Sequence, residues 1–138
     1  MGYRHKAREA ALQLLYSLEF VDELTPENIL DFWQLINKSS PGLKAFTMQI
    51  FKGVTENRPK IDDILQKASL HWRMDRMSLI DKNILRIAIF ELLFMDDIPF
   101  KVSIDEAIEM GKKFGAKNSG SFINGILDRV ASNMQKGQ

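Results

Sequence analysis

The sequence contains no cysteine and only two histidines, His5 and His71. Disulfide bonds, thiolate metal ligands and cysteine nucleophiles are therefore excluded. The two histidines lie far apart in the chain and do not form a pair with the spacing of zinc ligands. No glycine-rich loop follows a predicted strand, so a nucleotide cradle is unsupported. We expect neither a metal ion nor an organic cofactor.

The sequence also lacks an uninterrupted apolar run of the roughly 18 residues that a membrane-spanning helix needs. Its first segment does not have the form of a signal peptide, because Arg8, Glu9 and Gln13 interrupt the apolar residues. The absence of cysteine suits a reducing compartment. We therefore expect a soluble cytoplasmic protein that makes no contact with a membrane.

Neither sign of charge is in excess, since 19 Lys and Arg against 18 Asp and Glu give a net charge of +1. Whole-protein charge therefore indicates no particular partner. Two segments without any acid, 1–8 and 110–127, each hold three cations: Arg4, Lys6 and Arg8 in the first, and Lys112, Lys113 and Lys117 in the second. If the fold brings these segments together, they form one local positive patch.

Strict alternation of polar and apolar residues is absent, whereas apolar residues recur at helical spacing almost throughout. The pattern predicts an all-α protein of about seven helices, the last of them beginning near residue 119. The chain has 138 residues, no repeat and no long linker, which favours a single domain over 1–138.

Local signals predict several helix ends. Thr25–Pro26 and Ser40–Pro41 each combine an N-cap residue with proline at the first helical position. Two further helices are indicated by capping patterns.

Ser78 stands three residues before Asp81 and opens a segment that is apolar on nearly all sides, as in a buried central helix. Ser103 and Glu106 form a second capping-box pattern. We expect that helix to end at Gly115 in a left-handed cap.

The first predicted helix, residues 3–20, has cations at its start and an aromatic residue far from its apolar face. The core-facing stripe has four members: Ala7, Ala11, Leu14 and Leu18. Tyr16 falls nearly opposite this stripe, and Arg4 and Arg8 fall between the two faces. Cations at a helix start oppose the macrodipole, which favours a functional reason for them. An outward ring beside cations suits single-stranded nucleic acid, since cations hold phosphates and a ring stacks on a base. The alternative is that the cations are merely solvated and Tyr16 packs on another helix.

No base lies beside an orienting partner in a catalytic constellation, so we expect a binding protein and not an enzyme.

Three stretches form a specific combination: RHKAREAALQLLYSLEF at 4–20, DRMSLIDKNILRIAIFEL at 75–92 and IPFKVSIDEAIEMGKKFGAKNSGSFINGILDRV at 98–130. Together they resemble the NusB family of bacterial transcription antitermination factors. The resemblance covers nearly the whole chain and is weakest over residues 22–45.

The resemblance implies an all-helical fold of two packed bundles. It also implies binding to the boxA element of ribosomal RNA leader transcripts, in a complex with NusE, a small-subunit ribosomal protein. That complex keeps RNA polymerase from terminating early. Whether the free protein forms a homodimer is left open.

The residues and the resemblance together give nine predicted RNA-binding residues: Arg4, His5, Lys6, Arg8, Tyr16, Lys113, Lys117, Asn118 and Phe122. The cations would contact phosphates, and the rings of Tyr16 and Phe122 would meet bases, although Phe122 also fits a core stripe. Many relatives carry acid where this chain has Lys117 and Asn118. Asp81 is assigned to a basic partner protein, with helix capping as the alternative.

One alternative function belongs to another class: a helical protein-interaction scaffold without RNA binding of its own. An enzyme would require a deep polar pocket with perturbed carboxylates.

Overall fold

The helix α5, Leu79–Phe94, lies at the centre of the molecule, and most of its residues are buried. The structure is a computed structural model that describes residues 2–36 and 40–136. The prediction of a buried central helix is confirmed. Its first turn is held as expected, because the backbone N–H of Asp81 donates to Ser78 Oγ at 3.1 Å.

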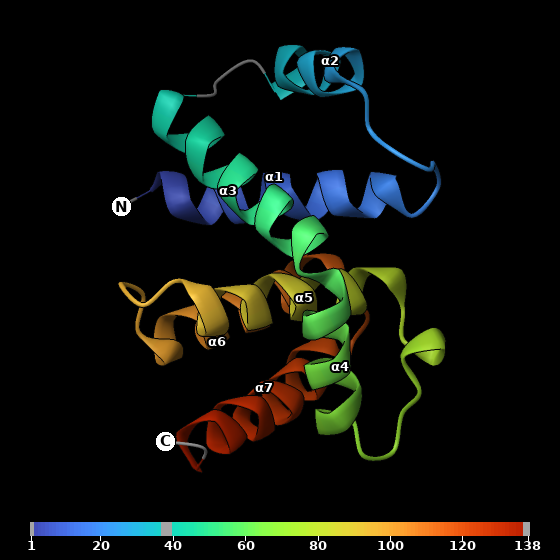
Figure 1. Ribbon diagram of the computed structural model, residues 1–138, viewed down its shortest axis with the longest axis vertical. Helices are drawn as coiled ribbons and strands as arrows, with labels where there is room; N and C mark the ends of the chain where they lie inside the picture. Colours follow the sequence, from blue (N-terminus) through green and yellow to red (C-terminus); the bar gives the residue numbers. More distant parts are fainter. Residues whose placement is uncertain (1, 37–39, 137–138) are drawn as a thin grey trace.

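The other helices form two groups on either side of α5 (Figure 1). The N-terminal group consists of α1 (Tyr3–Leu18), α2 (Pro26–Ile36) and α3 (Pro41–Glu56). The C-terminal group consists of α4 (Arg58–Ala68), the short 3-10 helix η1 (Met74–Arg76), α6 (Phe100–Phe114) and α7 (Ser119–Lys136). Both groups pack on α5, with α1 and α3 on one side and α4, α6 and α7 on the other. Within the described residues there are seven α-helices and no strand, so the predicted all-α class is confirmed.

Side-chain caps begin two of the N-terminal helices where the sequence predicted them. Thr25 Oγ1 accepts from the backbone N–H of Asn28 at 3.1 Å, and α2 begins at Pro26. Ser40 Oγ accepts from the backbone N–H of Leu43 at 3.2 Å. Each cap satisfies a backbone donor that lacks a partner within its own helix.

The predicted end of α6 at Gly115 is confirmed, but its predicted start and the left-handed conformation of Gly115 were wrong. The helix begins at Phe100, so Ser103 lies inside it, is buried, and donates to Glu91 at 2.7 Å instead of capping. Gly115 is extended, with φ −93° and ψ −166°, and is not a left-handed cap. A Cβ there would collide with the side chain of Ser119, so glycine is required by close packing against the start of α7.

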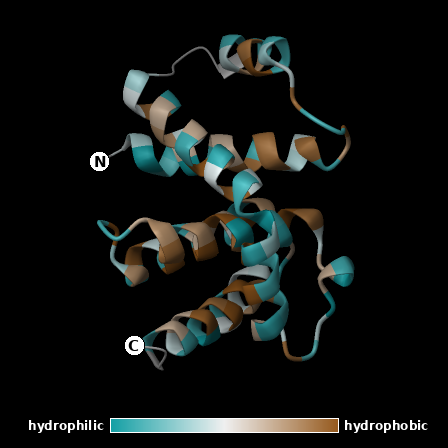
Figure 2. Ribbon diagram, viewed as in Figure 1, coloured by the Kyte–Doolittle hydropathy of each residue, from teal (hydrophilic) through white to brown (hydrophobic). Residues whose placement is uncertain are grey.

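The helix α1 is hydrophilic at its start and more hydrophobic farther along, as Figure 2 shows. Its buried side faces α3 and α5. Its outer side, the end of α6 and the start of α7 carry most of the residues predicted to bind RNA.

Candidate nucleic-acid interface

Acidic side chains from elsewhere in the fold meet the cations at the start of α1. Arg4 Nη2 lies 3.4 Å from Asp97 Oδ2, and its guanidinium lies 4.9 Å from the ring centroid of Phe46. His5 lies between two carboxylates, with Nδ1 2.9 Å from Glu106 and Nε2 3.1 Å from Glu9. The absence of acid in residues 1–8 therefore does not leave this cluster unpaired, because chain folding brings acids to it.

Arg8 does not lie on the exposed surface, and its prediction as a phosphate contact was wrong. The residue is 3% exposed, and its Nε and Nη2 donate to the two oxygens of Glu91 at 2.7 and 2.8 Å. Nη1 lies 3.3 Å from Glu106. Burial would lower the pKa of Arg8, but the hydrogen bonds and charges of the two glutamates raise it above its usual value. Arg8 is therefore a structural cation that links α1 to α5 and α6.

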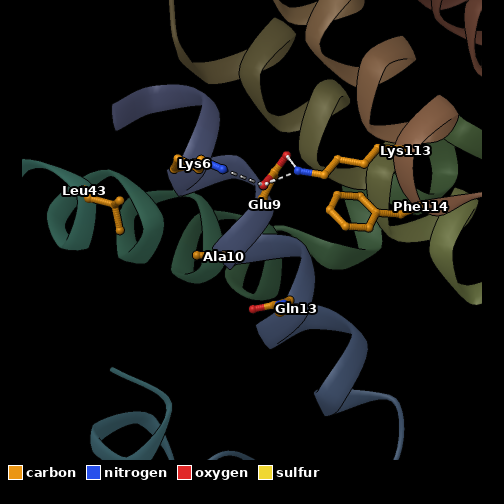
Figure 3. A pocket seen from close by; sticks show the side chains of 7 residues that line it. All are labelled: Lys6, Glu9, Ala10, Gln13, Leu43, Lys113 and Phe114. Atoms are coloured by element: carbon orange, nitrogen blue, oxygen red, sulfur yellow. Dashed lines mark hydrogen bonds and ion pairs between the residues drawn. The ribbon is translucent and has the colours of Figure 1, made fainter. Parts of the chain in front are cut away.

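Lys6 and Lys113 are exposed and converge on Glu9 from α1 and from the end of α6 (Figure 3). Lys113 Nζ lies 3.0 and 3.2 Å from the two carboxylate oxygens, and Lys6 Nζ lies 3.9 Å from one of them. The two all-basic segments of the sequence therefore meet, as the patch prediction required, but around an acid.

These side chains border an open cavity of about 470 Å³, here called the Glu9 cavity. Its lining consists of Lys6, Glu9, Ala10, Gln13, Leu43, Lys113 and Phe114. It offers two cations, a carboxylate, an amide, a ring and an apolar wall within one depression. Glu9 and Phe114 were not predicted as site residues. The signal for Glu9 was its spacing, since residues three and four positions apart meet on a helix, as His5, Lys6 and Glu9 do here.

Tyr16 is 38% exposed, so its predicted outward orientation is confirmed. Its ring contacts that of Phe20 edge to face, with centroids 5.1 Å apart. The two rings thus form an exposed aromatic surface near the C-terminal end of α1. Whether a base stacks there stays a prediction.

A second cavity, of about 290 Å³, lies where α5 and α7 begin and is here called the Asp81 cavity. Its lining includes Trp72, Arg76, Asp81, Asn118 and Phe122. Phe122 is half-buried and meets the exposed ring of Trp72 edge to face, with centroids 6.1 Å apart. The fold therefore brings together three predicted site residues that are separated in sequence.

Asp81 has one carboxylate oxygen, Oδ1, that is buried and receives no hydrogen bond from any residue in the described parts of the chain. A buried polar atom without a partner costs free energy. This oxygen can accept from a donor that enters the Asp81 cavity. Trp72 and Arg76, which also line the cavity, were not predicted, because the loop that carries Trp72 and the short 3-10 helix that carries Arg76 have no extended helical pattern.

Lys117 is exposed and forms no ion pair with any residue within 2–36 or 40–136. It precedes Asn118, which is exposed at the start of α7 and whose backbone carbonyl accepts from the N–H of Phe122 at 3.1 Å. The segment from Lys113 to Asn118 runs from the Glu9 cavity to the Asp81 cavity.

Comparison with known sequences identifies the family. The model of the NusB family matches residues 5–132. The chain belongs to the NusB family. It is 46% identical over 139 residues to the transcription antitermination protein NusB of Myxococcus xanthus, covering 99% of each chain. It is 43% identical to that of Desulforapulum autotrophicum, over 100% of this chain and 99% of the relative. The predicted resemblance is confirmed. The protein is therefore a transcription antitermination factor, which acts by binding and is not an enzyme.

Solved structures of the NusB family have the same fold. NusB of T. maritima matches with a TM-score of 0.82 and 39% identity, over 94% of this chain and 90% of that one. A chain from a crystal structure of the antitermination factors NusB and NusE in complex with dsRNA matches with a TM-score of 0.86. Its identity is 22%, over 96% of this chain and 98% of that chain, and the likeness shows the fold.

Among the helices described here, none is both long and apolar enough to cross a membrane.

Proposed function

We propose that this protein binds the boxA element of ribosomal RNA leader transcripts as a single strand, together with NusE. The resulting complex joins RNA polymerase in the cytoplasm and prevents premature termination. The observation that carries this proposal is the meeting of Lys6 and Lys113 at the Glu9 cavity, since cations from both basic segments border one depression. Lys117 continues the cationic surface toward Asn118.

Single-stranded RNA needs cations for its phosphates and rings for its bases. The exposed face of α1 supplies Lys6 and Tyr16, and the α6–α7 junction supplies Lys113 and Phe114. Because some lysines are paired with acids, RNA binding exchanges protein ion pairs for phosphate contacts. The net gain in affinity is therefore smaller than a count of cations suggests, and it falls with salt.

NusE is assigned to the Asp81 cavity. The unpartnered Oδ1 of Asp81 fits a cationic donor, and the exposed ring of Trp72 offers apolar area beside it. An Arg or Lys of NusE would pair with this carboxylate. The relative crystallised with NusE and dsRNA supports both partners for the family.

The test is a titration of boxA RNA and of a scrambled RNA, each with and without NusE, at low and high salt. We expect boxA to bind more tightly than the scrambled strand and NusE to increase the difference. The affinity should fall steeply with salt. Equal binding of both RNAs in the presence of NusE would refute boxA recognition.

The second candidate is a protein-interaction scaffold without RNA binding of its own. It is favoured by one observation, the pairing of Arg4, His5 and Lys6 with acids of the same chain. NusE binding without any salt-sensitive RNA binding would support the scaffold. Loss of NusE binding in Asp81→Ala, with RNA binding unchanged, would place the two partners on different cavities.

A further inference from the structure

The Glu9 cavity has a composition that a phosphate site does not need. Two lysines suffice to hold a phosphate, yet the carboxylate of Glu9 lies between them. Its side chain is 13% exposed and lines the cavity, with the carboxylate directed toward Lys113 (Figure 3). A carboxylate repels phosphate, so its position among the lysines calls for a ligand that also carries hydrogen-bond donors.

The ammonium of Lys113 covers the parts of the cavity that a base would use. It donates to both oxygens of Glu9, and it lies 5.2 Å from the ring centroid of Phe114. Its side chain is half-exposed, and the four-carbon stem of a lysine can change rotamer readily. If Lys113 turns to a phosphate, each oxygen of Glu9 regains one acceptor position, although Oε2 still lies 3.1 Å from His5 Nε2, and one side of the Phe114 ring is uncovered.

Among the four RNA bases, guanine alone presents two adjacent donors on its Watson–Crick edge, N1–H and the N2 amino group. An ionised carboxylate is an acceptor-only group with two oxygens, and it matches that pair. Uracil has one such donor, whereas adenine and cytosine place an acceptor beside their amino group.

We propose that the Glu9 cavity holds one guanine nucleotide of the bound RNA and reads its Watson–Crick edge. Glu9 accepts from N1–H and the N2 amino group, Phe114 stacks on the base, and Lys113 and Lys6 hold its phosphates. The apolar wall of Ala10 and Leu43 closes the site. The inference rests on the proposed RNA binding and adds the base that this part of the surface selects.

The experiment measures the affinity of the full chain for oligouridine strands that carry one guanine, inosine, adenine or cytosine. The wild type should prefer the guanine strand to plain oligouridine by about tenfold or more, the scale of one bidentate side chain–base pair. Inosine lacks the N2 amino group and should lose most of that preference. This arm varies only the ligand, so it does not depend on the folding of a variant.

Glu9→Gln should bring the affinities for guanine and oligouridine strands together, while oligouridine binds as tightly as before or more tightly. The reason is that an amide offers one acceptor and carries no charge to repel phosphate. Glu109→Gln is the matched control, since it removes the same charge from an exposed position on α6 outside the cavity. It should keep the guanine preference. Thermal melts check that both variants are folded.

Three results would overturn the inference: a wild type that binds all strands equally, a Glu9→Gln variant that keeps the preference, or one that weakens every strand alike. In each case RNA still binds, and the proposed function stands. Failure of the wild type to bind the guanine strand at low salt would also overturn the guanine site, whereas only failure to bind boxA RNA with NusE, titrated in parallel, would refute the proposed function.

Discussion

Arg8 and Glu91 form a buried two-bond ion pair, with N–O distances of 2.7 and 2.8 Å, that joins the first helix to the central one. Arg8→Ala leaves the Glu91 carboxylate charged and buried, and we expect a loss of about 3–5 kcal/mol in the free energy of unfolding. Urea unfolding measures it. The double variant Arg8→Met, Glu91→Leu should recover much of the loss. A destabilisation below 1 kcal/mol, on the scale of a surface pair, would contradict the structural role.

Removal of the exposed lysines should act on RNA binding without affecting the fold. For Lys6→Ala, Lys113→Ala and Lys117→Ala, each lost phosphate contact should reduce the slope of log affinity against log salt by about 0.7. Lys101→Ala removes an exposed lysine of α6 that pairs with Asp105 outside the Glu9 cavity. Its slope should equal that of the wild type. If the three variants also keep the wild-type slope, phosphates do not contact this surface.

Tyr16→Ala should weaken RNA binding by about 1–3 kcal/mol if a base stacks on the exposed ring. The melting temperature should change little, because Tyr16 is partly exposed and its ring contacts the exposed ring of Phe20. Tyr16→Phe keeps the stacking face and should bind RNA nearly as well. A large drop in melting temperature with normal RNA binding would show that the ring serves the fold.

Glu19 should make the stability depend on pH. Burial raises the pKa of Glu19. The hydrogen bond from Asn83 and the charge of Arg86 outweigh this effect, so the pKa lies below the reference value of 4.5. A lowered pKa in the folded state stabilises above the unfolded pKa. That contribution is complete above about pH 4.5 and is lost as the pH falls through the lower pKa of the folded protein.

In Glu19→Gln the loss of stability that protonation of Glu19 causes at low pH should be absent. The free energy of unfolding at neutral pH should be lower than in the wild type. Unfolding curves over a pH series measure both effects. Glu109→Gln, an exposed change on α6, should keep the wild-type pH dependence.

Asn118→Asp adds a charge at the start of α7, beside Lys117 and across the cavity from Asp81. The helix dipole should make the variant equally stable or more stable, by about 0.3–1 kcal/mol. RNA should bind more weakly, most clearly at low salt, where screening is least. Asn133→Asp adds the same charge at an exposed position farther along α7 and should leave RNA binding unchanged. Equal low-salt affinity in Asn118→Asp would remove Lys117 and Asn118 from the RNA surface.

Local chemistry made much of the fold predictable from the sequence. The caps at Ser40 and Ser78 depend on residues only a few positions away. A helix that is apolar on nearly all sides, such as α5, is stable only when it is buried in the core. Gly115 was misread because the need for glycine arises from Ser119 across a tight junction, and not from its backbone angles.

The site was less predictable because its partners come from distant parts of the chain. A helical projection places Arg8 between two faces, but its acceptor Glu91 is 83 positions away and is seen only in the fold. Likewise, Lys113 could be recognised as a cation, whereas its pairing with Glu9 depends on how α6 meets α1. Short-range spacing predicts helices, while charge pairing between helices requires their packing.

Because α5 packs against both groups of helices, residues of α1 and of the α6–α7 junction are held in fixed relative positions before any ligand arrives. A flexible chain that gathered the same groups would lose conformational entropy at the moment of binding. Here much of that ordering cost is met when the protein folds, so more of the contact energy remains available as affinity. A variant that loosens α5 should therefore weaken RNA binding even where every contacting side chain is unchanged.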